Sequence, residues 1–196
     1  EELSFDELLF AIDRIMAVVT TNLSVDFEAG YSDDPETVAE QVGILTHMGV
    51  VGINIEDGVV QDQKRILGSA QLLAEKIKAI NKKCEVFINA RIDTYTTKHP
   101  NALEETIRRA KIYQEAGADG IFVPLIETEA DIKAFVEAVS LPLNVFTTPN
   151  LPPYDRLAAL GVKRISHGGK QYDKLMKESE RLFTEFYQTK AYAILL

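Results

Sequence analysis

The first residues that could do chemistry lie in the segment VDFEAGY, residues 25–31, where two carboxylates stand two positions apart. Alternate residues of a β-strand point to the same face, so Asp26 and Glu28 are expected to converge. Neighbouring carboxylates make each other harder to ionise unless a cation lies close by. The segment therefore indicates either a solvated strand end or part of a divalent-metal site.

Polar side chains also end the other apolar segments of the chain. In a parallel β/α fold the carboxyl ends of all strands open on one side, so these side chains should meet there. They are Glu56 and Asp57, Arg91 and Asp93, Asn144, and His167.

Several carboxylates beside an arginine indicate a pocket for a 2-oxo acid. A hard cation such as Mg²⁺ prefers oxygen ligands, and a guanidinium recognises a planar carboxylate by two parallel hydrogen bonds. The metal would also stabilise an enolate as it forms. Structural roles remain open: Glu56 and Asp57 could cap the next segment, Arg91 could form an ion pair with Glu56 or Asp93, and His167 could be an ordinary loop histidine.

The elements that must position these residues follow a helix-then-strand rhythm. Glycines 49, 117 and 161 suit helix C-termini, where a positive φ is needed. The apolar segments predict strands within 23–31, 47–58, 85–95, 115–125, 141–149 and 159–169. Helical periodicity predicts helices over 1–18, 35–49, 66–83, 101–117, 128–139, 153–161 and 170–195.

This order, one helix and then six βα units, predicts an α/β fold with parallel strands. Two closures are possible: a (β/α)8 TIM-type barrel that lacks its first two strands, or an open, doubly wound, six-stranded sheet. Polar residues at five strand ends favour the barrel. We expect one domain, residues 1–196, that is incomplete at its N-terminus. The polar segment 59–68 is predicted to be a lid loop over the site.

Composition narrows the class of protein. The net charge of −9 argues against a nucleic-acid partner or an anionic membrane, and no apolar run reaches the length of a membrane span. The single cysteine, Cys84, cannot form an internal disulfide, so a cytoplasmic location is expected.

Together, the motifs VDFEAGY (25–31), GINIEDG (52–58), INARIDTY (88–95) and EAGADGIFVP (115–124) resemble the isocitrate lyase and phosphoenolpyruvate mutase superfamily. The resemblance implies a (β/α)8 barrel with Mg²⁺ at its mouth, held by Asp26, Glu28 and Glu56 largely through water. It also implies that Arg91 and Asn144 bind the substrate. The final helices would contact a neighbouring subunit, so a homo-oligomer, dimer or tetramer, is expected.

The chain departs from the true lyases of that superfamily at two places. Their lysine–cysteine–glycine–histidine stretch, which supplies the catalytic cysteine, is replaced here by VVQDQKRILG, residues 59–68. Pro124 and Leu125 stand where related enzymes carry an acid or a histidine. The usual isocitrate-cleaving route is therefore not expected.

The leading hypothesis is a Mg²⁺-dependent lyase or decarboxylase that breaks a C–C bond in a small 2-oxo or 2-hydroxy dicarboxylic acid through an enolate. Arg91, Glu56 and His167 are its predicted catalytic residues. The alternatives are P–C bond chemistry on phosphonopyruvate-like substrates, a class II aldolase with histidine ligands, and a non-catalytic relative. Tyr31, Asp57, Asp93 and His167 remain candidates for the proton donor.

Overall fold

The computed structural model describes residues 3–195, which divide into two compact units between Ile165 and Ser166. Within the described residues, no helix is both long enough and apolar enough to span a membrane.

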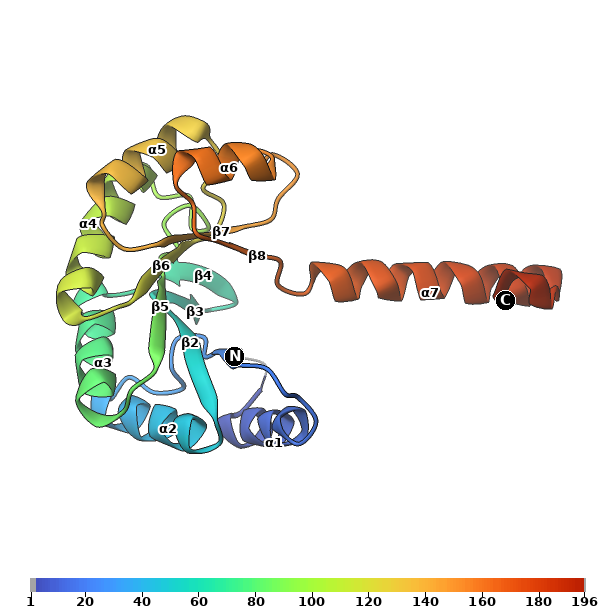
Figure 1. The fold of residues 1–196 in the computed structure, drawn as a ribbon, viewed down its shortest axis with the longest axis horizontal. Helices are drawn as coiled ribbons and strands as arrows, with labels where there is room; N and C mark the ends of the chain where they lie inside the picture. Colours follow the sequence, from blue (N-terminus) through green and yellow to red (C-terminus); the bar gives the residue numbers. More distant parts are fainter. Residues whose placement is uncertain (1–2, 196) are drawn as a thin grey trace. The chain divides into compact units, whose positions relative to one another are not determined.

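A curled sheet of six strands runs through the first unit in the order β1-β2-β5-β6-β7-β8 (Figure 1). The parallel pairings make each strand the neighbour of the one before it. A doubly wound sheet would reverse this order at a switch point, so the fold is a half-barrel, as predicted. The strands are β1 (Leu23–Asp26), β2 (Val50–Glu56), β5 (Phe87–Arg91), β6 (Gly120–Val123), β7 (Leu143–Phe146) and β8 (Arg164–Ser166).

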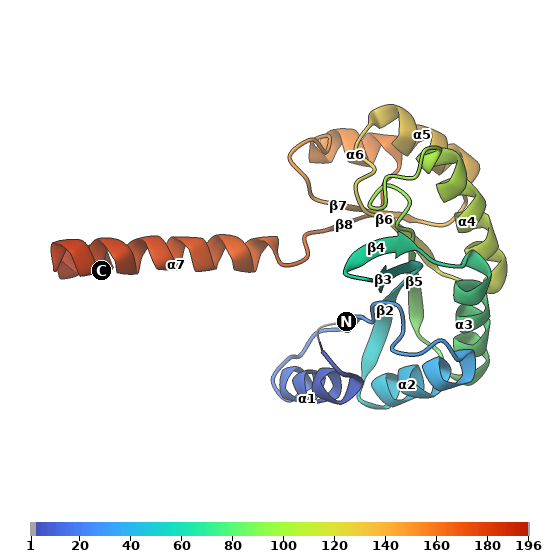
Figure 2. The same ribbon diagram turned by 180° about the vertical axis from the view of Figure 1, so that it is seen from behind.

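Helices cover the outer face of this sheet, and consecutive helices from α2 to α6 pack side by side (Figures 1 and 2). Side-chain caps fix several of their starts: Asp34 accepts a hydrogen bond from the Thr37 amide, and Ser4 and Glu7 form a capping box. Gly117 and Gly161 end their helices in the left-handed conformation, as predicted. The helices are α1 (Phe5–Met16), α2 (Pro35–His47), α3 (Ala70–Lys83), α4 (Ala102–Ala116), α5 (Glu129–Ala138) and α6 (Tyr154–Leu160).

The two faces of the strands carry different side chains. Residues that face the helices, such as Ile53, Ile88 and Val145, are fully buried and apolar. Residues that alternate with them face the barrel interior, where Asn89 Nδ2 donates to Asn54 Oδ1 at 2.8 Å. The outward apolar layer holds the helices, and the inward layer is left for polar chemistry.

The predicted lid loop is instead an antiparallel hairpin, and the prediction of an irregular segment was wrong. Strand β3 (Gly58–Gln61) pairs with β4 (Lys64–Leu67), and the hairpin lies on the inner side of the sheet. Asp62 and Gln63 form its turn with φ of 49° and 61°, the left-handed pair that a tight hairpin requires. Val59 opposite Ile66 supplies the β-branched pair that stabilises the strands.

The second unit contains α7 (Lys170–Thr189) and a 3₁₀ turn (Tyr192–Leu195). The sequence predicted one helix over 170–195, but Lys190 adopts φ of 54° and ends α7. Beyond that break, Tyr192 packs against Phe186 with ring centroids 5.5 Å apart. The subunit contact predicted for this segment stays a prediction.

Asp57 joins the base of the hairpin to the rest of the first unit. Its Oδ1 accepts from the Asp93 amide at 2.9 Å, and its Oδ2 accepts from Arg109 Nη1 at 3.0 Å and Tyr113 Oη at 2.6 Å. Arg109 Nη1 also donates to the Gly68 carbonyl at 3.0 Å. Burial raises the pKa of Asp57, whereas these three donors favour its ionised form.

We predict that Asp57→Asn lowers the free energy of unfolding by about 2–3 kcal/mol, because it leaves the buried Arg109 without its charged partner after β2. Urea unfolding measures the change. Asp62→Asn, at the exposed hairpin turn where Asn tolerates a positive φ, is the matched control and should change stability little. Equal, small changes for both variants would contradict the role given to Asp57.

Candidate active site

The acidic segment after β1 is wound into an unusual backbone. Strand β1 ends at Asp26, and Glu28, Gly30 and Tyr31 then take φ values of 49°, 98° and 57°. Asp26 and Glu28 do line the same cavity, as expected, but not as alternate residues of one strand, because Glu28 lies beyond the end of β1. Non-glycine residues hold such angles only where the surroundings impose them, which is common at functional sites.

Hydrogen bonds from neighbouring elements impose this backbone. The Phe27 amide donates to the Asn54 carbonyl at 2.9 Å, and the Glu56 amide donates to the Glu28 carbonyl at 2.8 Å. From α3, Lys76 Nζ donates to the Ala29 carbonyl at 2.8 Å. The segment is thus fixed on one side by β2 and on the other by a buried lysine.

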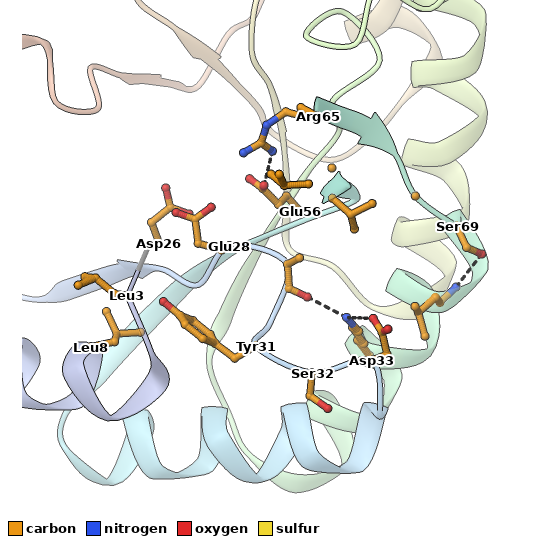
Figure 3. A pocket seen from close by; sticks show the side chains of 17 residues that line it. Leu3, Leu8, Asp26, Glu28, Tyr31, Ser32, Asp33, Glu56, Arg65 and Ser69 are labelled. Atoms are coloured by element: carbon orange, nitrogen blue, oxygen red, sulfur yellow. Dashed lines mark hydrogen bonds and ion pairs between the residues drawn. The ribbon is translucent and has the colours of Figure 1, made fainter. Parts of the chain in front are cut away.

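The three carboxylates predicted to hold a metal line one cavity of about 1020 Å³. Figure 3 shows the side chains of Asp26, Glu28 and Glu56 directed into it, with Arg65 bound to Glu56. The cavity is also lined by apolar side chains of α1, the hairpin and α3, among them Leu8, Val59, Val60 and Leu72.

Glu56 and Asp93 form an ion-pair cluster with two arginines. Arg91 Nε donates to Asp93 Oδ1 at 2.9 Å, and Arg91 Nη1 lies 2.8 Å from Glu56 Oε2, an ion pair without hydrogen-bond geometry. Arg65 Nη1 contacts both Glu56 Oε1 and, at 2.6 Å, Asp93 Oδ2. The pairing predicted for Arg91 is confirmed with both acids.

Burial and the two neighbouring arginines have opposite effects on the pKa of Glu56. Burial raises the pKa of Glu56 to about 7, against the opposing effects of Arg91 and Arg65. The carboxyl group can therefore gain or lose a proton near neutral pH, which is the behaviour expected of a functional acid.

Asn144 and His167 complete the set of predicted site residues. Asn144 is buried on β7, in register with Phe122 of β6, and Arg91 lies over the Phe122 ring at 5.7 Å from the centroid. His167 is exposed and belongs to the second unit. The substrate-binding role of Asn144 and the catalytic role of His167 stay predictions.

The donor set suits Mg²⁺. Among the residues that the structure describes, no three His, Cys, Asp or Glu side chains gather closely enough to hold a metal ion directly. Mg²⁺ usually keeps several of its waters, so carboxylates that share a cavity can hold it through them. Glu56 Oε2 is buried and accepts no hydrogen bond from the described residues, which leaves an oxygen lone pair for a water or a cation. Asp26, Glu28 and Glu56 stay the predicted metal residues.

Arg65 is the site residue that the sequence did not reveal. It follows Lys64 in a polar stretch that was assigned to a loop, and such stretches are usually solvated. The apolar pairs Val59-Val60 and Ile66-Leu67, which flank the polar residues 61–65, could have indicated a hairpin. Only the hairpin register shows that Arg65 turns inward.

Comparisons with known proteins agree with this architecture. The sequence model of the family described as Phosphoenolpyruvate phosphomutase matches residues 1–187. An uncharacterised protein of Mycobacterium tuberculosis is 39% identical over 163 residues, which cover 83% of this chain and 60% of that protein. The oxaloacetate decarboxylase of Pseudomonas entomophila is 28% identical over 180 residues, 89% of this chain and 62% of the enzyme. The chain thus spans less than two thirds of the length of these relatives.

Solved structures show the same fold. A Burkholderia cenocepacia protein provisionally assigned as a phosphonomutase superposes with a TM-score of 0.87 at 32% identity, over 94% of this chain and 77% of that one. A phosphonopyruvate hydrolase crystallised with oxalate and Mg²⁺ superposes with a TM-score of 0.83 at 23% identity, over 98% of this chain and 70% of that one.

We predict that Gly58→Ala displaces the hairpin from the site. An added Cβ would lie 2.0 Å from Asp93 Oδ2 and 2.6 Å from Arg65 Nη1, so the ion pair must break or the hairpin must move. Overpacking of this kind typically costs about 1–3 kcal/mol, and urea unfolding measures it. Gly43→Ala on α2, where a Cβ meets nothing within 4 Å, is the control and should stabilise by about 0.5–1 kcal/mol. If Gly58→Ala left the free energy of unfolding unchanged, the Arg65–Asp93 ion pair would not be packed tightly against Gly58.

Proposed function

The chain belongs to the phosphoenolpyruvate phosphomutase family of the isocitrate lyase and phosphoenolpyruvate mutase superfamily, and from that premise we propose that it is a Mg²⁺-dependent lyase or decarboxylase. Relatives in this superfamily include lyases, decarboxylases, mutases and hydrolases. The proposed substrate is a small 2-oxo or 2-hydroxy dicarboxylic acid, and the proposed reaction breaks its C–C bond next to the forming enolate.

The charge of the strand-end cluster carries this proposal. Four carboxylates, Asp26, Glu28, Glu56 and Asp93, face two guanidinium groups, Arg65 and Arg91, which leaves a formal charge of −2. A dication neutralises that charge, and the low dielectric of a partly buried site strengthens the attraction. Carboxylate oxygens are also the ligands that Mg²⁺ prefers.

Arg91 is the proposed substrate-binding group. Asp93 and Glu56 hold its guanidinium from two sides, and its side chain keeps 16% of its surface exposed. A guanidinium fixed in this way can present its remaining donors to the carboxylate of a 2-oxo acid without losing rotamer freedom on binding. Asn144, on the neighbouring β7, is proposed to donate to the same substrate.

Mg²⁺, when bound, supplies Lewis-acid stabilisation of the negative charge that develops on the 2-oxo group. The chain must then protonate the carbon that loses its substituent. Of the candidate donors, Asp57 and Asp93 are both fully buried in hydrogen-bonded ion pairs. Tyr31 lines the cavity, with its ring 5.3 Å from that of Phe27, so we favour its hydroxyl as the proton donor.

P–C bond chemistry on a phosphonopyruvate-like substrate is the second candidate. Arg65 gives the site a second guanidinium, which would suit a phosphonate as well as a distal carboxylate. The 32% identity to a protein provisionally assigned as a phosphonomutase supports it. A non-catalytic relative is the third reading, and the acids and arginines that line the cavity argue against it.

We predict that the full-length protein converts oxaloacetate to pyruvate in the presence of Mg²⁺. A coupled assay for pyruvate measures the rate. Arg91→Lys should lower kcat/KM by on the order of 100-fold, because an ammonium cannot reproduce the planar, two-point contact. Arg14→Lys, on the exposed surface of α1, is the matched control. Turnover of phosphonopyruvate alone would favour the second candidate, and no turnover of any 2-oxo acid in a panel would refute the enzymatic proposal.

We predict that Mg²⁺ affinity rises about tenfold between pH 6 and pH 8. The carboxyl group of Glu56, with its pKa raised to about 7, must lose its proton before it can hold a cation, and it is mostly protonated below that pH and mostly ionised above it. Calorimetry at several pH values measures the affinity and the proton released. Glu56→Gln should flatten the profile, whereas the exposed Glu36→Gln should leave it unchanged. The same pH dependence in Glu56→Gln would assign the proton to another group.

A further inference from the structure

We propose that Arg65, on the β3–β4 hairpin, is a specificity-determining residue that binds the second acid group of a dianionic 2-oxo acid, either a distal carboxylate or a phosphonate. This inference rests on the proposed function and extends it. It concerns a residue of the hairpin, where the chain departs from the cysteine-bearing stretch of the true lyases.

The hairpin places Arg65 at the cavity from a different direction than the strand ends. Arg91 extends from the end of β5, whereas Arg65 enters from β4, and in Figure 3 its guanidinium lies above Glu56 with Asp26 and Glu28 across the cavity. A substrate that meets Arg91 with one acid group would therefore meet Arg65 with another.

The contacts of Arg65 leave much of its guanidinium available. Both of its contacts within the described residues use a single amino group, Nη1, which reaches Glu56 Oε1 and Asp93 Oδ2. The planar group has three further N–H bonds, two on Nη2 and one on Nε. The side chain also keeps 29% of its surface exposed, against 16% for Arg91. The Glu56 and Asp93 contacts thus orient the fork, and its outer donors remain for a ligand.

Arg65 balances the formal charge of the two acids, because Arg91 alone leaves one negative charge on the pair. Arg91 already contacts Glu56 at 2.8 Å and Asp93 at 2.9 Å and 3.2 Å. A second guanidinium on the same pair is costly to desolvate for stability alone, since buried ion pairs seldom repay their desolvation. An anionic ligand is a further partner for this guanidinium, whose Nη2 and Nε make no contact within the described residues.

The hairpin is also built to keep Arg65 in place. Gly58 starts β3 directly beneath the Arg65–Asp93 pair, with no room for a Cβ. The second strand is held at the same base by the Gly68 amide, which donates to the Asp57 carbonyl at 2.7 Å. The hairpin therefore holds Arg65 at a fixed position. A residue needs such a position if it is to select substrates by the distance between their two acid groups.

The test compares ligands that differ in the second acid group. With the full-length protein saturated with Mg²⁺, calorimetry measures the affinity for pyruvate, which has one acid group, and for 3,3-difluorooxaloacetate and phosphonopyruvate, which have two. Arg65→Gln should weaken the binding of at least one two-acid ligand by on the order of 30-fold, the loss expected for a charge-assisted hydrogen-bond pair. Pyruvate affinity should change less than about threefold.

Two further variants separate recognition from folding. Arg65→Lys keeps the charge near Glu56 but not the fork, so it should recover only part of the affinity for the two-acid ligand. Lys64→Gln, an exposed change on the same strand, should leave all three affinities unchanged. Because Arg65 also lowers the pKa of Glu56, the titrations are made at pH 8.5, where that carboxyl group is more fully ionised. Thermal unfolding verifies that each variant is folded.

The outcomes are distinguishable. Equal losses for pyruvate and the two-acid ligands, or no loss for any of them, would overturn the role of Arg65 and leave the proposed function intact. Failure of the wild-type protein to bind any of the three ligands with Mg²⁺ would overturn both.

Discussion

The site depends on one carboxylate, that of Glu56, held between two guanidinium groups. Arg91 approaches Oε2 and Arg65 approaches Oε1, while the backbone amide of Glu56 fixes the carbonyl of Glu28. The same residue therefore links the first strand's acidic segment, the end of β5 and the hairpin. Burial raises the pKa of Glu56 to about 7. Near neutral pH, its carboxyl group can therefore carry a proton, or be ionised and pair with the arginines or a cation.

The neighbouring residue, Asp57, makes this arrangement rigid. Its side chain accepts hydrogen bonds from Arg109 and Tyr113 of α4, away from the ion-pair cluster. It also accepts a hydrogen bond from the Asp93 amide. Glu56, the last residue of β2, and Asp57, the residue after it, thus have separate roles, because their side chains contact different groups. One faces the cavity, and the other anchors the hairpin and β5 to the helical layer.

The sequence predicted the fold better than it predicted the site. The six βα units and their order follow from hydrophobic runs and helix-ending glycines, which report local chemistry directly. The strand-end acids and Arg91 follow from the rule that parallel strands open on one side. The left-handed backbone at Glu28 and the inward turn of Arg65 do not, because both depend on contacts with distant residues, Lys76 and Asp93, that local patterns do not encode. The site roles themselves stay predictions.

The identity of the hairpin side chain constrains the chemistry. A cysteine in a lid can give or take a proton, whereas an arginine stays charged at any working pH and can only attract and orient an anion. Arg65 therefore supplies no proton in the proposed reaction, and Tyr31 lines the same cavity. The proposed site thus combines a fixed positive charge on the hairpin, which suits a substrate with an additional acid group, with a proton donor on the β1 side.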